Sequence, residues 1–401
     1  PPGERGSYTS WIQTTATMGL FLSLLVITLC RVTLGEATFA AWGWRIPFLV
    51  SSVLLALSMW IRLKLNESPV FQKMVDEGTT SKKPLTEAFA DRANLKLVVL
   101  ALVGLTAGQA VVWYTGQFYS LFFLEKTLKV DGLTTNALVA TALLIGTPFF
   151  VVFGWLSDRI GRKPIILAGC LLAVLTYFPI FKALTVAANP ALAAATASAP
   201  VTVIADPADC AFQFDPIGKS AFASSCDIAK SALANAGVSY RNEAAPAGTL
   251  ARVRIGASEL ASIDGRNLSR KDLADARAAW TKTLGAALAG AGYPAKADPA
   301  QINRPMVVGL LTLLVLYVTM VYGPVAAALV EMFPARIRYT SMSLPYHIGN
   351  GWFGGFLPAT AFAMVAASGD IYRGLWYPIV IATITLVAGG LFIREMRGAP
   401  I

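Results

Sequence analysis

The chain has 401 residues, of which 55% are hydrophobic and only 14% are charged. Soluble globular proteins carry about 25% charged residues, so this composition argues against an ordinary soluble enzyme and excludes an intrinsically disordered chain. The formal net charge of +10 would suggest a nucleic-acid-binding surface on a polar protein, but here it accompanies a mean hydropathy of +0.59. The positions of the positive charges along the chain therefore decide what they mean.

Long runs with almost no charged residue recur along the chain. A bilayer core of about 30 Å is crossed by about 20 helical residues, and a helix satisfies its own backbone groups in hydrocarbon. Buried helices of a large soluble protein are the alternative, but they would need polar faces at the helical repeat, which segments such as 21–27 and 97–103 lack. The eight predicted spans are 8–30, 44–63, 95–124, 136–156, 164–186, 306–330, 341–367 and 375–393.

The loops between the spans alternate in charge. One side carries 15 Lys and Arg residues and the other six, leaving out the long loop 187–305, because long translocated segments do not follow the charge rule. Because the positive side is normally cytoplasmic, both termini and the loop between the second and third spans are predicted to be cytoplasmic. Most of the positive charge is then a topology signal beside anionic lipid headgroups, and no nucleic-acid partner is predicted.

Residues 187–305 differ from the rest in being rich in Ala, with 12 Lys and Arg and 10 Asp and Glu residues, and they fall on the outer side. The predicted elements are strands at 201–204, 211–214 and 250–255 and helices at 227–236 and 270–288. Ser269 is a typical N-cap for the second helix. We expect a small periplasmic α+β domain in which Cys210 and Cys226 form a disulfide in an oxidising compartment.

The most specific local signal is the short turn GWLSDRIGRKP at 154–164, between the fourth and fifth spans. A second group of acid and bases, EMFPARIRYT at 331–340, follows the sixth span. The second span opens with WGWRIPF at 42–48 and is followed by NESPVF at 66–71, and the chain begins with GSYTSW at 6–11. These segments resemble the major facilitator superfamily and, within it, the metabolite:proton symporter family of bacterial inner-membrane carriers of organic acids, shikimate, or proline and betaine.

This resemblance implies an all-α polytopic membrane protein in which the eight spans correspond to the fifth to twelfth helices of a twelve-helix fold, with a small inserted α+β soluble domain. Because the chain also lacks an initial Met, we expect a fragment whose N-terminal part is missing. The implied divisions are 1–63, the last two helices of the N-terminal bundle; 64–94, a cytoplasmic loop; 95–186, the first three helices of the C-terminal bundle; 187–305, the inserted domain; and 306–401, the last three helices and a short tail.

The resemblance also implies alternating access about a site near the bilayer midplane. In the outward-facing state, Asp158 should dock against the start of the first span near residues 7–10 and pair with Arg336. The remaining residues of the predicted gating set are Arg159, Arg162, Glu331 and Arg338, with Arg159 or Arg162 facing Glu331. The alternative is that these are ordinary solvated loop charges.

Substrate contacts are expected from polar or aromatic side chains deep inside spans, because such groups are costly in lipid unless they face a cavity or a partner. The predicted substrate-binding residues are Gln13, Thr14, Thr17, Gln109, Trp113, Tyr114, Gln117, Asn350 and Trp352. For the threonines the alternative is a bond to their own helix, and for the aromatic residues simple packing. Because histidine side chains in general exchange protons near neutral pH, the single histidine, His347, is the candidate for proton coupling, although a position near the headgroups would leave it simply hydrated.

No cofactor, metal or enzymatic activity is predicted. One His and four separated Cys cannot form a metal cluster, and no phosphate-binding glycine loop with Lys-Ser/Thr occurs. A membrane enzyme would need an acid, Ser/His or metal constellation near one interface, and none is visible.

The sequence thus predicts a monomeric, multi-pass transporter of the bacterial inner membrane that moves a small organic acid together with protons. Because no Arg or Lys lies mid-span, a zwitterionic metabolite is also a candidate substrate. The alternative function is a membrane-anchored sensor or binding protein whose outer domain binds a ligand or partner.

Overall fold

The computed structural model describes residues 3–65, 69–395 and 397–398. In this part of the chain, eight helical segments are long and apolar enough to cross a membrane, which confirms the eight predicted spans. Their bounds are Arg5–Leu34, Arg45–Lys64, Arg92–Thr127, Gly132–Ile160, Arg162–Ala188, Arg304–Met332, Arg338–Ser368 and Arg373–Phe392. Residues 66–68 of the NESPVF segment lie outside the described residues.

Several spans consist of more than one helical element. Breaks occur at Pro148, at Pro324 and in the glycine-rich stretch 349–355, where the helical hydrogen-bond ladder is interrupted or wider π-helical turns form. The elements are α1 (Arg5–Leu34), α3 (Arg45–Lys64), α6 (Arg92–Ala101), η2 (Leu102–Thr106), α7 (Ala107–Tyr114), η3 (Thr115–Tyr119), α8 (Ser120–Phe122), η4 (Phe123–Thr127), α9 (Gly132–Gly146), α10 (Phe149–Ile160), α11 (Arg162–Ala188), α15 (Arg304–Tyr322), α16 (Val325–Met332), α17 (Arg338–Ile348), η6 (Gly349–Gly354), α18 (Leu357–Ser368) and α19 (Trp376–Phe392).

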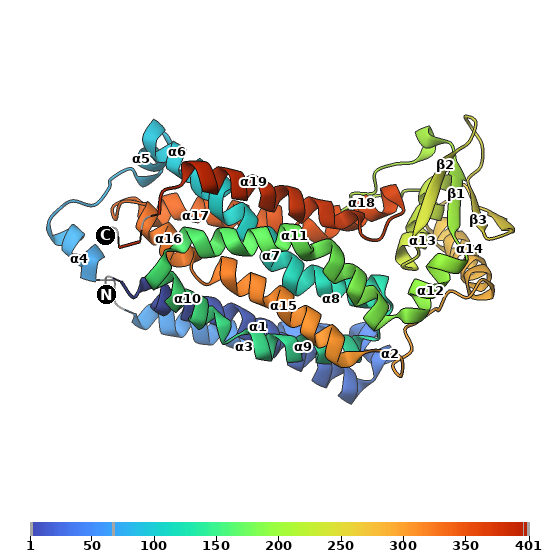
Figure 1. Cartoon of the computed structure of the whole chain (residues 1–401), viewed down its shortest axis with the longest axis horizontal. Helices are drawn as coiled ribbons and strands as arrows, with labels where there is room; N and C mark the ends of the chain where they lie inside the picture. Colours follow the sequence, from blue (N-terminus) through green and yellow to red (C-terminus); the bar gives the residue numbers. More distant parts are fainter. Residues whose placement is uncertain (1–2, 66–68, 396, 399–401) are drawn as a thin grey trace.

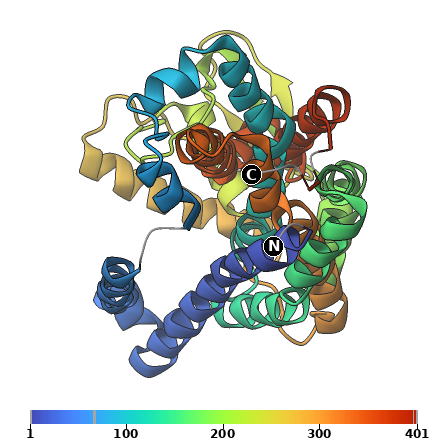
Figure 2. The same cartoon turned by 90° about the vertical axis from the view of Figure 1, so that its left-hand side faces the viewer.

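The spans from α6 onward pack into one bundle, and α1 lies along α9 and α10 at its side. Figure 2 shows α3 standing apart from the other spans, and none of its residues is buried. Short helices join the spans: α2 (Glu36–Thr38) and η1 (Phe39–Gly43) follow α1, and α4 (Pro69–Asp76) and α5 (Pro84–Phe89) follow α3.

The two ends of the bundle carry different segments. In Figure 1 both termini lie at the same end as α4 and α5, and the domain between α11 and α15 lies at the opposite end. This arrangement follows from eight crossings, because an even number of spans returns the chain to the side on which it began.

The domain between α11 and α15 is α+β. It contains α12 (Pro190–Ser198), β1 (Val201–Ala205), η5 (Pro207–Asp209), α13 (Ser225–Asn235), β2 (Tyr240–Ala244), β3 (Arg252–Ile255), β4 (Ser258–Ala261) and α14 (Arg270–Gly290). The sheet order is β2-β1-β3-β4, with β2 parallel to β1 and the other pairs antiparallel. Residues 201, 203 and 205 of central strand β1 are buried and alternate with less buried ones, as expected for a sheet covered on one face.

Most predicted elements of this domain are confirmed, namely β1, β3, α13 and α14. Ser269 caps α14, since its Oγ accepts the amide of Asp272 at 3.2 Å. The predicted strand at 211–214 is wrong. The amide of Ala211 donates to Asp227 Oδ1 at 2.8 Å and the Gln213 side chain donates to the Asp227 carbonyl, so this coil is held by side-chain contacts and not by a strand ladder.

The domain is hydrogen-bonded to the ends of the membrane helices. At the end of α18 the amide of Tyr240 donates to the Gly369 carbonyl at 2.7 Å, and Asn242 Nδ2 donates to the Ser368 carbonyl at 2.9 Å. On the other side, the amide of Ala297 donates to the Lys129 carbonyl at 3.0 Å. The last carbonyl groups of a helix have no N–H donors within that helix. The domain therefore supplies hydrogen-bond donors to carbonyls at the end of α18.

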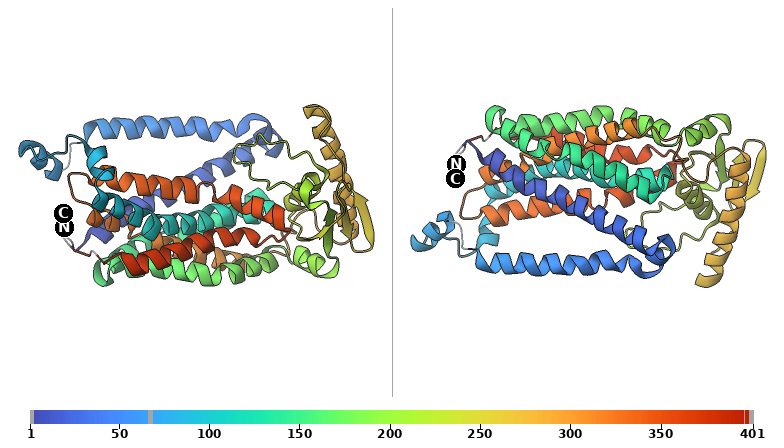
Figure 3. Two further views of the ribbon diagram at one scale, coloured as in Figure 1. Left: turned by 90° about the horizontal axis from the view of Figure 1, so that it is seen from above. Right: turned by 90° about the horizontal axis from the view of Figure 1, so that it is seen from below.

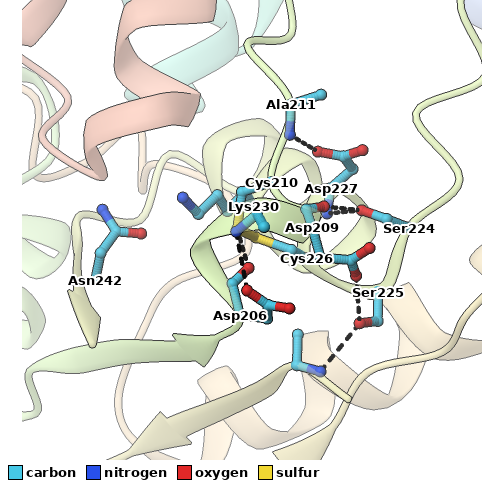
Figure 4. The surroundings of a disulfide bond; sticks show 12 residues. Asp206, Asp209, Cys210, Ala211, Ser224, Ser225, Cys226, Asp227, Lys230 and Asn242 are labelled. Carbon is cyan, nitrogen blue, oxygen red and sulfur yellow. Dashed lines mark hydrogen bonds between the residues drawn. A yellow bond between two sulfur atoms is a disulfide. The ribbon is translucent and has the colours of Figure 1, made fainter. Parts of the chain in front are cut away.

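The two cysteines of the domain, Cys210 and Cys226, are joined by a disulfide. Figure 4 shows this disulfide between the end of η5 and the start of α13, with Asp227 bonded to the amide of Ala211 beside it. The disulfide therefore ties together both ends of the coil between η5 and α13.

Candidate functional site

The end of the bundle near the termini contains a buried carboxylate that joins two helices. Asp158, near the end of α10, accepts hydrogen bonds from the amides of Gly6 and Ser7, both at 2.8 Å, and from Ser7 Oγ at 2.7 Å. Gly6 and Ser7 lie in the first turn of α1, where backbone N–H groups are unpaired and the helix dipole favours a negative charge. The structure thus places Asp158 on the start of the first span, as the sequence motif predicts.

Arg162, at the start of α11, is almost completely buried between two carboxylates. Its Nη1 lies 2.8 Å from Asp158 Oδ1, and its Nη2 and Nε donate to the two oxygens of Glu331 at 3.1 and 3.3 Å. Gly161 precedes it with φ +105°, a left-handed conformation that glycine adopts without strain and that turns the chain sharply between α10 and α11. The guanidinium therefore forms a fork with Glu331 while also holding Asp158.

Glu331, in α16, has a fully buried side chain and binds a second cation. Arg5 Nη1 of α1 donates to Glu331 Oε1 at 3.3 Å. Asp158, Arg162, Glu331 and Arg5 together join α1, α10, α11 and α16, and their two negative charges balance two positive ones. This set, the inner charge network, closes the bundle at the end where the termini lie.

The predicted pairing of Asp158 with Arg336 is wrong. Arg336 lies in the loop after α16 and donates to Glu87 Oε2 of α5 at 3.1 and 2.7 Å, because α5 packs beside this loop. These hydrogen bonds lower the pKa of the Glu87 carboxyl below its ordinary value. Two other predicted gating residues also lie outside the network: the Arg159 guanidinium stacks on the Trp155 ring, and Arg338 donates to the Phe333 carbonyl.

Glycine at two positions allows α1 and α10 to approach closely enough for the network to form. A Cβ at Gly154 would lie 2.5 Å from Ser10 Cβ and 2.6 Å from the Gly6 carbonyl oxygen, and a Cβ at Gly6 would collide with Ser157. The contact between the two helices therefore depends on these small residues.

Replacement of Gly154 by alanine should separate α1 from α10 and lengthen the Asp158 hydrogen bonds. We expect a loss of about 1–3 kcal/mol in the free energy of unfolding, measured as a lower midpoint of thermal unfolding in detergent. Gly19→Ala is the matched control on α1, because nothing lies within 4 Å of the Cβ that it would add. An unchanged midpoint for Gly154→Ala would contradict the tight contact.

A second set of polar side chains lies in the middle of the bundle. Gln109 and Gln117, both on the third span, are fully buried. Gln109 Nε2 donates to Asn350 Oδ1 of η6 at 3.3 Å, and Gln117 Nε2 donates to Thr17 Oγ1 of α1 at 3.2 Å. The Oε1 atoms of both glutamines have no hydrogen-bond partner within the described chain. Such atoms are costly inside a membrane protein unless water or a ligand meets them.

Aromatic rings lie beside these amides. The Trp113 ring contacts Tyr114, with ring centroids 4.8 Å apart, and Tyr322 of α15 at 5.8 Å. Tyr322 Oη lies 2.7 Å from Tyr346 Oη of α17, so the rings join the third, sixth and seventh spans. Trp113 Nε1 is another buried donor without a partner among the described residues. We call Gln109, Gln117, Asn350, Trp113 and Tyr114 the central polar cluster.

Four predicted residues do not join this cluster as donors or acceptors. Thr14 Oγ1 donates to the Ser10 carbonyl of its own helix, and Gln13 is buried one turn before Thr17. Trp352 is 68% exposed with its ring near Phe356, and His347 is exposed beside Tyr346. Tyr346 and Asn350, four residues apart, occupy the inner face of this span, which turns positions 347 and 352 outward.

Two contributors were missed by sequence reasoning. Arg5 of the inner charge network is one of the 15 Lys and Arg residues that indicate only topology, and the sequence patterns assign no role to Tyr346. The available signal for Arg5 was its place one residue before GSYTSW, where an arginine can meet an acid from another helix end. For Tyr346 the signal was its spacing of four residues from Asn350.

The helices that can span a membrane define a polytopic membrane protein. The charge network lies at the short turn between α10 and α11, and this turn carries the loop motif of a known transporter fold. Residues 1–211 match the sequence model of the Major Facilitator Superfamily, which is more than half of the chain. The chain belongs to the Major Facilitator Superfamily.

Curated relatives share part of this chain. The shikimate transporter of Escherichia coli (strain K12) is 31% identical over 191 residues, which cover 46% of this chain and 42% of that protein. The citrate-proton symporter of Salmonella typhi is 29% identical over 189 residues, 46% of this chain and 42% of that protein. The proline/betaine transporter of Escherichia coli (strain K12) is 30% identical over 191 residues, 45% of this chain and 37% of that protein.

The matched part thus spans less than half of the length of these relatives. No solved structure gives a significant match.

Proposed function

We propose that this chain is part of a secondary active transporter that works by alternating access and carries a small organic acid or zwitterionic metabolite together with protons. The observation that carries the proposal is the inner charge network. Asp158, Arg162 and Glu331 hold α1 against α10, α11 and α16 at one end of the bundle. Buried ionic contacts of this kind are discrete, so opening that end requires breaking them together, which suits a gate between two states.

We further propose that the termini and residues 64–94 face the bacterial cytoplasm and that residues 187–305 face the periplasm. The excess of Lys and Arg at the end with the termini supports this orientation. The disulfide between Cys210 and Cys226 also supports it, because disulfides persist in the oxidising periplasm.

The central polar cluster is the proposed substrate site. The amide and indole N–H groups of Gln109, Gln117 and Trp113 can donate to a carboxylate, and the Trp113 and Tyr114 faces can accept an alkylammonium group. No Lys or Arg belongs to this cluster. An uncharged donor set with aromatic faces therefore suits a zwitterion at least as well as a simple anion, and both classes occur in the names of the relatives, which include shikimate, citrate and proline/betaine.

Uptake by proteoliposomes tests this function. The full-length protein would be screened with citrate, 2-oxoglutarate, shikimate and betaine, with and without an uncoupler. We expect uptake of one class that falls to the background when the proton gradient is dissipated.

Gln109→Leu should lower that uptake at least tenfold, which corresponds to about 1.4 kcal/mol, since it removes the amide bonded to Asn350. Trp376→Phe, an exposed residue of α19 outside the cluster, is the matched control and should transport normally. Metabolite binding without any uptake, unaffected by Gln109→Leu, would contradict transport and favour a sensor.

A further inference from the structure

The coil between η5 and α13 carries apolar side chains that the inserted domain does not bury. Phe212, Phe214 and Ile217 are 54%, 39% and 73% exposed. The ends of the coil are closed by the disulfide between Cys210 and Cys226. The exposed rings therefore lie on a closed loop, residues 211–222, which we call the disulfide loop.

This loop reaches along the outer half of α18. The rings of Phe214 and Phe356 contact each other, with centroids 6.2 Å apart. Phe356 precedes Ser368, the last residue of α18, by 12 positions, or about 18 Å of helix at 1.5 Å per residue. In Figure 3 (left view) a coil of the domain extends toward the membrane helices beside α18. Phe214 of the loop thus lies at a depth where the bilayer is hydrocarbon.

A cavity separates part of the loop from the helices. Its volume is about 320 Å³, and its lining includes Gln213 and Asp215 of the loop, Lys126 of η4, and Ala359 and Ala363 of α18. Ser231, Ala234 and Asn235 of α13 and Phe362 and Ala366 of α18 complete its lining, so charged, amide and apolar side chains from the domain, the third span and α18 surround it. This mixture is typical of a space that holds water.

Irregular backbone with polar side chains cannot face lipid at this depth. Each unpaired peptide group or charge in hydrocarbon costs several kcal/mol, so non-helical segments occur there only inside protein or along a water-filled cavity. The face of α18 that carries Phe356, Ala359 and Ala363 must therefore look into water or protein and not into lipid.

The same span connects this face to the central polar cluster. Asn350 of η6, six residues before Phe356, accepts from Gln109, and Gly354 abuts the Tyr114 ring so closely that any Cβ would collide with it. The space beside the loop therefore lies along the same span as the proposed substrate site, nearer to the inserted domain. The opposite end of the bundle is closed by the inner charge network.

The hydrogen bonds of the loop allow its middle to move while its ends stay fixed. At the ends, the amide of Ala211 and the side chain of Gln213 donate to Asp227, and the Arg277 guanidinium donates to the Ala221 and Phe222 carbonyls. In the middle, the hydrogen bonds are internal: the amide of Ser220 donates to Asp215 Oδ2 at 2.6 Å, and the amide of Phe214 donates to the Phe212 carbonyl. Residues 214–220, the middle of the disulfide loop, can therefore swing as a unit without opening the domain.

We propose that the disulfide loop is a lid that occupies the water-filled outer vestibule of the transport pathway and must leave α18 for a substrate to enter. This inference rests on the proposed transport function. The apolar contact of Phe214 with Phe356 keeps the lid closed, and the fixed ends return it to the same place.

Thiol labelling tests the vestibule without any need for transport. With the buried Cys30 and Cys170 replaced by serine, Ala359→Cys should react with a membrane-impermeant thiol reagent added from outside, because Ala359 lines the cavity and is only half-buried. Triple replacement of Phe212, Phe214 and Ile217 by serine should increase the labelling rate several-fold. Val380→Cys is the matched control, because Val380 is exposed near the outer end of α19 and should stay unlabelled. An Ala359→Cys variant as unreactive as Val380→Cys would overturn the proposal.

Cross-linking tests the lid itself. In the same background, Phe214→Cys with Phe356→Cys should be joined by a short bifunctional thiol cross-linker, since the two rings are in contact, and the cross-linked protein should lose uptake while each single variant keeps it. Failure to cross-link, or full uptake after cross-linking, would overturn the lid. If the labelling and cross-linking succeed but no variant, including the uncross-linked protein, takes up any metabolite, then the proposed transport function fails and the vestibule placement stands.

Discussion

Replacement of Glu331 by glutamine is expected to destabilise the protein by about 3–5 kcal/mol and to abolish uptake. The Glu331 carboxylate is fully buried and accepts from Arg162 at 3.1 and 3.3 Å and from Arg5 at 3.3 Å. Removal of its charge leaves more buried positive charge than negative charge in the inner charge network, and the dehydration of the guanidinium groups is no longer compensated. Thermal unfolding in detergent and proteoliposome uptake measure the two effects.

Glu87→Gln is the matched control for this loss. Glu87 also pairs with an arginine, Arg336, but that pair is largely exposed, and exposed ion pairs contribute little to stability because water screens them. We expect its thermal midpoint to stay close to the original one. A Glu331→Gln variant as stable as Glu87→Gln would show that the network does not hold the helices together.

A double replacement distinguishes the contribution of the Arg162–Glu331 ion pair to stability from its contribution to transport. Arg162→Leu with Glu331→Leu removes both charges, and apolar pairs often substitute for buried ion pairs with little loss of stability. The double variant should therefore be more stable than Glu331→Gln while still failing to transport. This outcome would assign the network to the conformational equilibrium and not merely to folding.

The membrane spans were predictable because hydrocarbon accepts few backbone geometries. A run of about 20 apolar residues has one stable conformation there, so length and hydropathy fix each helix within a few residues. The α+β domain was less predictable. Strand β2 (Tyr240–Ala244) has one buried residue followed by four exposed ones, so its sequence lacks the alternation that signals a strand, and it forms because β1 supplies a parallel partner.

Contacts between segments far apart in the sequence were predictable only where a sequence motif indicates them. Asp158 reaches the start of α1 because its motif places an acid at a helix end, and a helix start attracts such an acid. Arg336 was misassigned because its choice between Asp158 and Glu87 depends on how α5 packs, which no local pattern encodes. The same holds for Gln109 and Asn350, which are 241 positions apart in the chain.

Replacement of Asp158 by asparagine is expected to open the end of the bundle near the termini and to lower uptake at least tenfold. The Asp158 side chain meets only donors: the amides of Gly6 and Ser7, the Ser7 hydroxyl and the Arg162 guanidinium. Asparagine keeps one acceptor oxygen but turns an N–H₂ group toward the remaining donors. A loss of about 2 kcal/mol in the closed state, as expected for charged hydrogen bonds, would change the ratio of closed to open forms about 30-fold.

Distances between spin labels at Tyr8→Cys and Trp155→Cys measure this change, because both side chains are exposed beside the contact between α1 and α10. Asp158→Asn should shift the distribution to longer distances. Arg159→Ala is the matched control, since Arg159 stacks on Trp155 outside the network, and in the presence of the Trp155→Cys label it should leave both the distances and the uptake unchanged. If Asp158→Asn transports normally with an unchanged distribution, then Asp158 does not hold the gate, and the conformational equilibrium must be set by Arg162 and Glu331 alone.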